Sequence, residues 1–229
     1  KIQVAMNKII LALDTPDAHQ ALKITKKVKD KIYTIKIGSE FYFRFGKEGV
    51  KKFNDIGINN IFLDLKIHDI GNTVHKAILA LKDISFKYLS IHSLGGNEAI
   101  KKAKTTAKEI NPNLKILAVT VLTSINEAEL KKMGVNSKVE DLVLSLAKNS
   151  SDADGFIASG AEAKMLRENF PKHILFTPGV RLPGDNQHDQ KRVVTPAESL
   201  KFSDKVIMGR SLLQGDVDKN LEKVLNSIK

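Results

Sequence analysis

The chain contains no cysteine and no tryptophan among its 229 residues. The absence of cysteine excludes disulfides, thiolate metal sites and cysteine nucleophiles. No apolar run approaches the roughly 18 residues that a membrane-spanning helix needs. The first residues also lack the basic, apolar and small-residue pattern of a secretory signal. We therefore expect a cytoplasmic protein that has no membrane partner.

Arginine is scarce, whereas lysine is abundant. The chain has five arginines, 32 lysines and 26 acidic residues, so its net charge is +11. A charge of this size is found in nucleic-acid-binding proteins. The lysines are nevertheless spread over many predicted helices, and neither an arginine cluster nor an aromatic stacking set accompanies them. Solvated lysine faces are the preferred interpretation, so no nucleic-acid partner is expected, although a basic surface attracts small anions.

Eight short apolar segments alternate with segments of helical periodicity, which is typical of parallel strands buried on both faces. The predicted strands cover residues 9–14, 33–38, 60–66, 88–94, 115–123, 155–160, 174–180 and 205–210. This α/β pattern predicts a (β/α)8 TIM barrel that forms a single domain over residues 6–229. Residues 1–5 precede Met6 and are interpreted as an N-terminal extension. A doubly wound open sheet is the alternative fold.

Several residues mark the expected ends of helices. Ser137 and Thr195 each precede a glutamate by three residues, and each pair predicts a capping box at a helix start. Gly57 and Gly134 stand where the C-terminus of a helix favours a left-handed residue. The longest irregular stretch, residues 181–194, contains Pro, Gly, Asp, Asn, Gln and His. This composition predicts a loop over an active site.

Charged side chains follow the predicted strand ends. Asp64 and Lys66 end the third strand and point to the same side, because successive strand residues alternate between faces. Asp14 ends the first strand, and Lys36 lies in the second. Each has a plainer explanation: Asp14 as a helix cap, Lys36 as a surface lysine, and Asp64 with Lys66 as a structural ion pair. Three adjacent strands with this pattern favour an active site, which barrels place at these ends.

The last quarter of the chain has the features of a phosphate site. Arg210 follows Gly209 at the end of the eighth strand, and the loops after strands seven and eight commonly bind phosphate in such barrels. Glycine admits close approach, and a guanidinium group binds phosphate oxygens in pairs. Arg181 and Gln190 flank the loop after the seventh strand and are expected to bind the same group. No set of His, Asp and Glu has the spacing of metal ligands, so no metal is expected.

These motifs together resemble the orotidine 5′-phosphate decarboxylase family in its bacterial form. Residues 64–73, Asp-Leu-Lys-Ile-His-Asp-Ile-Gly-Asn-Thr, resemble its signature. The segments that match in the same order are residues 12–14, 36–38, 119–124, 177–181, 189–190 and 208–211. The matches extend over nearly the whole chain. The signature run is specific, whereas the Gly-Arg pair by itself is a weak signal.

The resemblance implies a (β/α)8 barrel that converts orotidine 5′-phosphate to UMP and carbon dioxide, the last step of de novo UMP synthesis. It implies no metal, no organic cofactor, and a homodimer with active sites at the subunit interface. Lys66 is then the proton donor to C6 of the pyrimidine, Asp64 lies beside the departing carboxylate, and Lys36 completes the charge network. Asp69 and Thr73 are expected to reach into the partner's site.

The resemblance also implies the remaining substrate contacts. Asp14 and Lys36 are expected to hold the ribose hydroxyls, and Thr123 the pyrimidine. The phosphate region is expected to contain Pro178, Arg181, Gln190, Gly209 and Arg210.

Two alternative functions are kept. Sugar-phosphate decarboxylases and aldolases of the same superfamily have a similar Asp-x-Lys-x-x-Asp run but use Mg2+ to stabilise an enediolate. The run from His68 to Thr73 and the long loop after Arg181 favour the pyrimidine enzyme. A basic nucleic-acid-binding protein on a barrel scaffold is the more remote alternative, because surface binding does not explain charges at strand ends.

Overall fold

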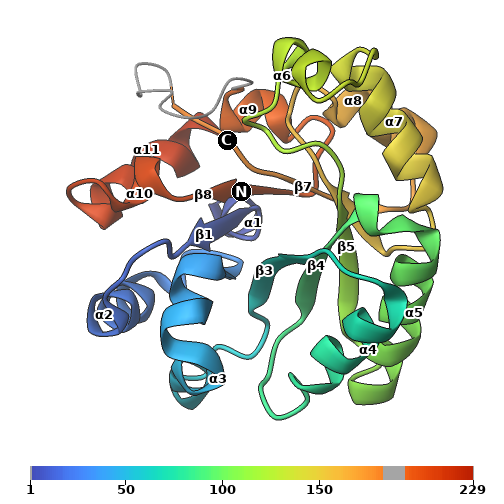
Figure 1. Cartoon of the computed structure of the whole chain (residues 1–229). Helices are drawn as coiled ribbons and strands as arrows, with labels where there is room; N and C mark the ends of the chain where they lie inside the picture. The colour runs from blue at the N-terminus through green and yellow to red at the C-terminus, as the bar shows by residue number, and fades with distance from the viewer. Residues whose placement is uncertain (1, 183–193, 229) are drawn as a thin grey trace.

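Eight parallel strands form a closed barrel in chain order, and the eighth strand pairs with the first (Figure 1). The computed structural model describes residues 2–182 and 194–228. The strands are β1 (Ile9–Ala12), β2 (Thr34–Gly38), β3 (Phe62–Ile67), β4 (Tyr88–His92), β5 (Lys115–Val119), β6 (Gly155–Ile157), β7 (Ile174–Thr177) and β8 (Lys205–Met208). The predicted (β/α)8 barrel is confirmed, and the open sheet is wrong.

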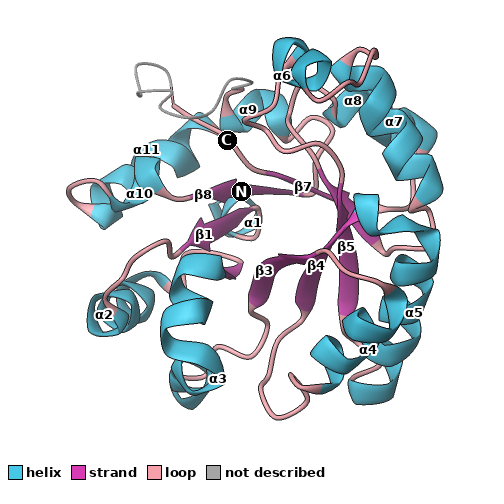
Figure 2. Cartoon of the chain, in the orientation of Figure 1, coloured by secondary structure: helices cyan, strands magenta, loops and turns pink. Residues whose placement is uncertain are grey.

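Helices connect the strands, and most of them lie on the outside of the barrel (Figure 2). They are α1 (Ile2–Met6), α2 (Ala18–Val28), α3 (Ser39–Asp55), α4 (Gly71–Leu79), α5 (Gly96–Ile110), α6 (Glu127–Lys132), α7 (Val139–Asn149), α8 (Ala163–Asn169), α9 (Pro196–Ser199), α10 (Arg210–Leu213) and α11 (Val217–Ser227), with a 3-10 turn, η1 (Ser93–Gly95), after β4. No helix within residues 2–182 and 194–228 is long and apolar enough to cross a membrane.

The strands end earlier than their apolar character predicts. β1 ends at Ala12 and β5 at Val119, so Asp14 and Thr123 lie in the loops that follow. Leu13 remains fully buried although it lies beyond the last residue of β1. Hydropathy therefore extended the predicted strands into loops that still pack against the core.

Two apolar layers stabilise the barrel. The inner layer includes Ile10, Phe62 and Phe176, and the ring centroids of the two phenylalanines lie 5.8 Å apart. The outer layer packs strand residues such as Leu11 against helix residues such as Val50. Full burial of one such side chain contributes about 1.5–3 kcal/mol. The barrel is therefore filled by side chains, and a ligand must bind at its mouth.

The expected helix ends are partly confirmed. Thr195 forms the predicted capping box with Glu198 at the start of α9. Gly57 and Gly134 adopt φ of 88° and 80° after α3 and α6, as predicted for C-terminal caps. The box predicted at Ser137 is wrong, because α7 has Lys138 as its N-cap residue, without a side-chain cap. The Ser137 hydroxyl donates instead to the carbonyl of its neighbour Lys138.

Candidate active site

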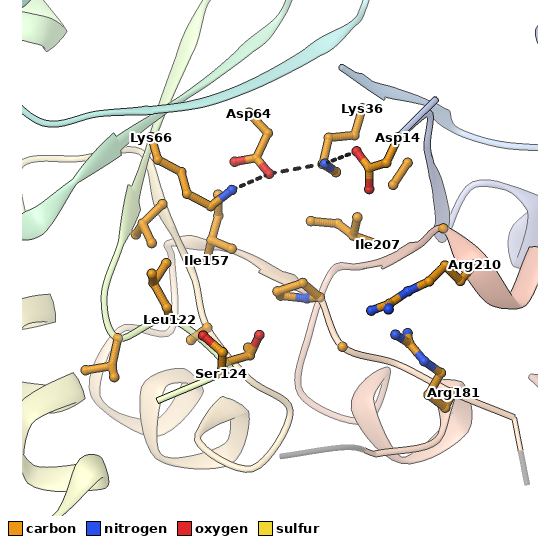
Figure 3. Close-up of a pocket in the computed structure, with 18 of the residues that line it drawn as sticks. Asp14, Lys36, Asp64, Lys66, Leu122, Ser124, Ile157, Arg181, Ile207 and Arg210 are labelled. Carbon is orange, nitrogen blue, oxygen red and sulfur yellow. Dashed lines mark hydrogen bonds and ion pairs between the residues drawn. The ribbon is translucent and has the colours of Figure 1, made fainter. Parts of the chain in front are cut away.

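A cavity of about 280 Å³ lies at the carboxyl ends of the strands (Figure 3). Its charged lining residues are Asp14, Lys36, Asp64, Lys66, Arg181 and Arg210, and its other lining residues include Thr123, Pro178 and Gly209. The structure thus brings together residues that the sequence assigned to one site. Four cations and two carboxylates give this lining a formal charge of +2, which favours an anionic ligand.

Four of these side chains form a continuous chain of alternating charge. The Nζ atom of Lys36 lies 3.2 Å from Oδ1 of Asp14 and 3.4 Å from Oδ2 of Asp64. The same Oδ2 atom accepts a hydrogen bond from Nζ of Lys66 at 2.7 Å. Figure 3 shows this row along one side of the cavity. β2 supplies Lys36, β3 supplies Asp64 and Lys66, and the loop after the adjacent strand β1 supplies Asp14.

The two buried members of the row hold each other in the charged form. Burial disfavours the ammonium of Lys36, but Asp64 and Asp14 outweigh burial and raise its pKa above the usual 10.5. Burial likewise disfavours the Asp64 carboxylate, yet Lys36, Lys66 and a hydrogen bond from Ser90 lower its pKa below 3.8. A carboxylate and an ammonium, both largely buried, therefore lie side by side at neutral pH.

Lys66 occupies an unusual backbone position. Its φ of 45° is the one positive value of a non-glycine residue in the described part of the chain. The pairing of β3 with β4 shifts register between Leu63 and Ile67, which marks a bulge. Strained backbone of this kind is concentrated at functional sites. The predicted shared orientation of Asp64 and Lys66 is thus present, but on a bulged strand.

Ser90 is a residue of this site that the sequence reasoning missed. It lies on β4 and is fully buried. Its hydroxyl donates to Oδ1 of Asp64 at 2.8 Å and accepts the backbone N–H of Lys66 at 2.9 Å. The available signal was a single small polar residue inside the otherwise apolar core of a strand, next to the charged strand.

Two arginines line the other end of the cavity, where Figure 3 shows their guanidinium groups close to each other. Arg181 follows β7 and is buried, and its Nη1 donates to the carbonyl of Val180. Val180 pairs with Val194, so the two ends of the loop between them are joined. Arg210 is the first residue of α10, directly after Gly209. A Cβ on Gly209 would lie 3.3 Å from the Cβ of Ala12, a tight contact that glycine avoids.

Apolar side chains form the middle of the cavity between its two charged ends. Ile157 and Ile207 belong to the inner layer of the barrel and form the part of that layer that lines the cavity. Six further lining residues belong to segments that matched the family in sequence: Ala12, Val119, Val121, Leu122, Ser124 and Gly179. The sequence reasoning did not single out Ala158 and Leu213, which also line the cavity. A flat, weakly polar group fits between such walls.

Two predicted site residues do not line this cavity, and a third cannot be placed in it or outside it. Asp69 and Thr73 are exposed and do not line it, and Asp69 accepts a hydrogen bond from the backbone N–H of Ile70. Gln190 lies outside the residues that the structure describes. Within the described ranges, no group of three or more His, Cys, Asp or Glu side chains is arranged to hold a metal ion.

The fold and the cavity define a (β/α)8-barrel enzyme whose charged groups gather at the carboxyl ends of its strands. The model of the orotidine 5′-phosphate decarboxylase / HUMPS family matches residues 7–223. The chain therefore belongs to this family.

Individual relatives agree with this assignment. An orotidine 5′-phosphate decarboxylase of Buchnera aphidicola is 37% identical over 225 residues, covering 96% of this chain and 94% of the relative. One of Nitrosococcus oceani is 40% identical over 210 residues, covering 90% of each chain. The crystal structure of orotidine 5′-phosphate decarboxylase from Lactobacillus acidophilus superposes with a TM-score of 0.82 at 33% identity, covering 97% of this chain and 99% of that one.

Proposed function

We propose that the protein decarboxylates orotidine 5′-phosphate to UMP and carbon dioxide, the last step of de novo UMP synthesis, without a metal or an organic cofactor. The observation that carries the proposal is the cavity with an alternating Lys–Asp row at one end and two arginines at the other. The names of the relatives support the same reaction. Such a biosynthetic enzyme would work in the cytoplasm, and we propose no nucleic-acid partner.

The arginine end suits the phosphate of this substrate. Arg181 and Arg210 each present a planar set of N–H donors, and a phosphate oxygen pair matches that geometry. Gly209 allows the backbone to approach the same group. The apolar middle, with Ile157 and Ile207, would hold the pyrimidine, and Thr123 would contact it from its loop, whereas Pro178 would belong to the phosphate region. Asp14 and Lys36 would bind the ribose hydroxyls.

The Lys–Asp row suits the reacting end. Loss of carbon dioxide leaves a pair of electrons on C6 of the pyrimidine, and no cofactor accepts them. The ammonium of Lys66 would stabilise that developing charge and then transfer its proton to C6. Lys66 is bonded to Asp64, and Lys36 lies on the other side of that carboxylate, so the ammonium is held in place before the substrate arrives.

Asp64 would add repulsion that is relieved as the reaction proceeds. Its carboxylate is charged at neutral pH and would lie beside the substrate carboxylate. Two like charges at close range disfavour the bound substrate, and the repulsion disappears when neutral carbon dioxide leaves. Binding at the distant phosphate supplies the free energy that offsets this repulsion.

We also propose a homodimer with shared active sites. Asp69 and Thr73 are exposed and lie outside their own cavity, so they are free to enter a neighbour's site. Ile70, beside Asp69, is 71% exposed, and Leu94 is 60% exposed. Large exposed apolar side chains next to such residues support a protein interface.

Subunit mixing tests the shared site. Lys66→Ala and Asp69→Ala variants should each be inactive, and a mixture that exchanges subunits should regain activity, because one mixed site has both residues intact. A mixture of Lys66→Ala with Asp64→Asn is the matched control. Those two residues act in the same site, so no mixed site is complete and activity should stay absent. Failure of the first mixture to recover would contradict the shared site.

The reaction itself is tested with the purified protein and orotidine 5′-phosphate in excess EDTA. We expect the substrate absorbance to fall as UMP and carbon dioxide form. No turnover by folded protein, followed by turnover of a sugar phosphate when Mg2+ is restored, would instead support the alternative of a Mg2+-dependent sugar-phosphate decarboxylase or aldolase.

A further inference from the structure

Ser90 lies where β4 faces the charged segment of β3. The two strands pair at Leu63 with Leu89 and next at Ile67 with Ile91. Three residues of β3 therefore lie opposite one residue of β4, and that residue is Ser90. Its side chain is fully buried and does not line the cavity. A group placed there cannot touch a ligand in the cavity, but it can fix the strand that does.

The Ser90 hydroxyl forms one hydrogen bond with each of the two proposed catalytic residues. It accepts the backbone N–H of Lys66 at 2.9 Å and donates to Oδ1 of Asp64 at 2.8 Å. The first bond satisfies a backbone group that the bulge removes from regular strand pairing. The second leaves Oδ2 of Asp64 to bind Nζ of Lys66 at 2.7 Å and to face Nζ of Lys36 at 3.4 Å.

We propose that Ser90 is a positioning residue for the decarboxylation. Its hydroxyl holds the left-handed backbone of Lys66, at φ 45°, and the orientation of the Asp64 carboxylate at the same time. The kinetic part of this proposal rests on the proposed function. A hydroxyl is suited to both tasks because it donates and accepts at once, which no aliphatic side chain of similar size can do.

The physical reason is that proton transfer tolerates little displacement of the proton donor. The ammonium must lie within hydrogen-bond reach of the reacting carbon, and a shift of about 1 Å in such a group costs roughly 100-fold in rate. Without Ser90, the disfavoured left-handed backbone of Lys66 loses a buried hydrogen bond and is free to relax. The phosphate end, formed by Arg181 and Arg210, lies at the other end of the cavity and would be unaffected.

Ser90→Ala tests the proposal, and Ser150→Ala is the matched control. Ser150 is equally buried, and its hydroxyl has no hydrogen-bond partner among the described residues. For Ser90→Ala we expect kcat to fall roughly 10- to 100-fold, the range for losing a hydrogen bond to a charged group. UMP affinity should change less than about threefold, because phosphate binding dominates it. The control should match wild type in both measurements.

Ser90→Thr separates positioning from space filling. Thr retains the hydroxyl and adds a methyl group, whereas Ala keeps only the Cβ atom and loses the hydroxyl. Positioning predicts that Thr keeps more of kcat than Ala. Space filling predicts the reverse order, which would overturn the proposal. Wild-type kcat in Ser90→Ala, or parallel losses of kcat and UMP affinity, would overturn it as well.

Amide hydrogen exchange gives a readout that does not depend on turnover. The Lys66 amide should exchange faster in Ser90→Ala than in wild type and in Ser150→Ala. If wild type does not decarboxylate orotidine 5′-phosphate, the proposed function fails, but this exchange still tests whether Ser90 holds the bulge. Unchanged exchange at Lys66 would refute that structural part.

Discussion

Replacing Asp64 with Asn removes the central charge of the Lys–Asp row while keeping the size of the side chain. The Asp64 side chain is 8% exposed and is bonded or paired to Lys66, Lys36 and Ser90. The substitution leaves Lys36, 10% exposed, with Asp14 as its remaining carboxylate in the row. A buried ammonium that loses an anionic neighbour becomes costly to keep charged.

The expected loss of stability follows from the exposed fractions of the side chains in the row. Removing one partner of a buried ion pair typically costs about 3–5 kcal/mol. Lys66 is 38% exposed and Asp14 53% exposed, so water and Asp14 compensate part of the loss. We therefore expect a decrease of about 3 kcal/mol in the free energy of unfolding. For a domain of this length, that corresponds to a drop in Tm of roughly 6–12 °C.

Urea and thermal unfolding of wild type and Asp64→Asn measure the difference. Asp83→Asn is the matched control, because Asp83 also pairs with two lysines, Lys47 and Lys51, but at the surface. Surface pairs contribute little, so its Tm should shift far less. Equal shifts for Asp64→Asn and Asp83→Asn would refute the reasoning that burial makes the row energetically important.

Three further predictions concern the phosphate end, a helix end and acid stability. Arg210→Ala should weaken UMP binding roughly 10- to 100-fold and leave uridine binding nearly unchanged in calorimetry, since the lost bonds are to a charged group; equal losses would contradict the phosphate assignment. Gly57→Ala should lower the free energy of unfolding, measured in urea, by about 1–2 kcal/mol, because the φ of 88° is unfavourable for alanine. Gly71→Ala should cost less, because a Cβ there would meet its nearest neighbour at an ordinary 3.7 Å. The pKa of Asp64 is lowered, so its stabilisation is present above pH 3.8 and is lost as pH falls through the folded pKa. The stability difference between wild type and Asp64→Asn should accordingly be constant near neutral pH and shrink below pH 3.8.

The barrel was predictable from the sequence because each strand is a short apolar run bounded by helical periodicity. Strand ends were less predictable, since Leu13 continues the apolar run of β1 into a loop. The failed box at Ser137 shows a related limit. A Ser with Glu three residues later satisfies the pattern, but the chain places Lys138 at the start of the helix and the hydroxyl bonds elsewhere.

The charged part of the site was predictable because alternation along a strand fixes which side chains share a face. Asp64 and Lys66 share the cavity with Lys36, as that rule predicts. The bulge at Lys66 and its link to Ser90 depend on the register between β3 and β4, a long-range property that local patterns do not encode. In the proposed dimer, the roles of Asp69 and Thr73 would depend on a partner subunit, which the sequence of one chain does not position.

The most direct test of the proposed mechanism is the turnover of orotidine 5′-phosphate by Lys66→Ala, measured together with its affinity for UMP. Lys66 is proposed to act on C6, whereas the arginine end binds the phosphate. The account predicts that turnover disappears while UMP still binds within a few-fold of the wild-type affinity. Substantial turnover by folded Lys66→Ala would contradict the assignment of Lys66 as the proton donor.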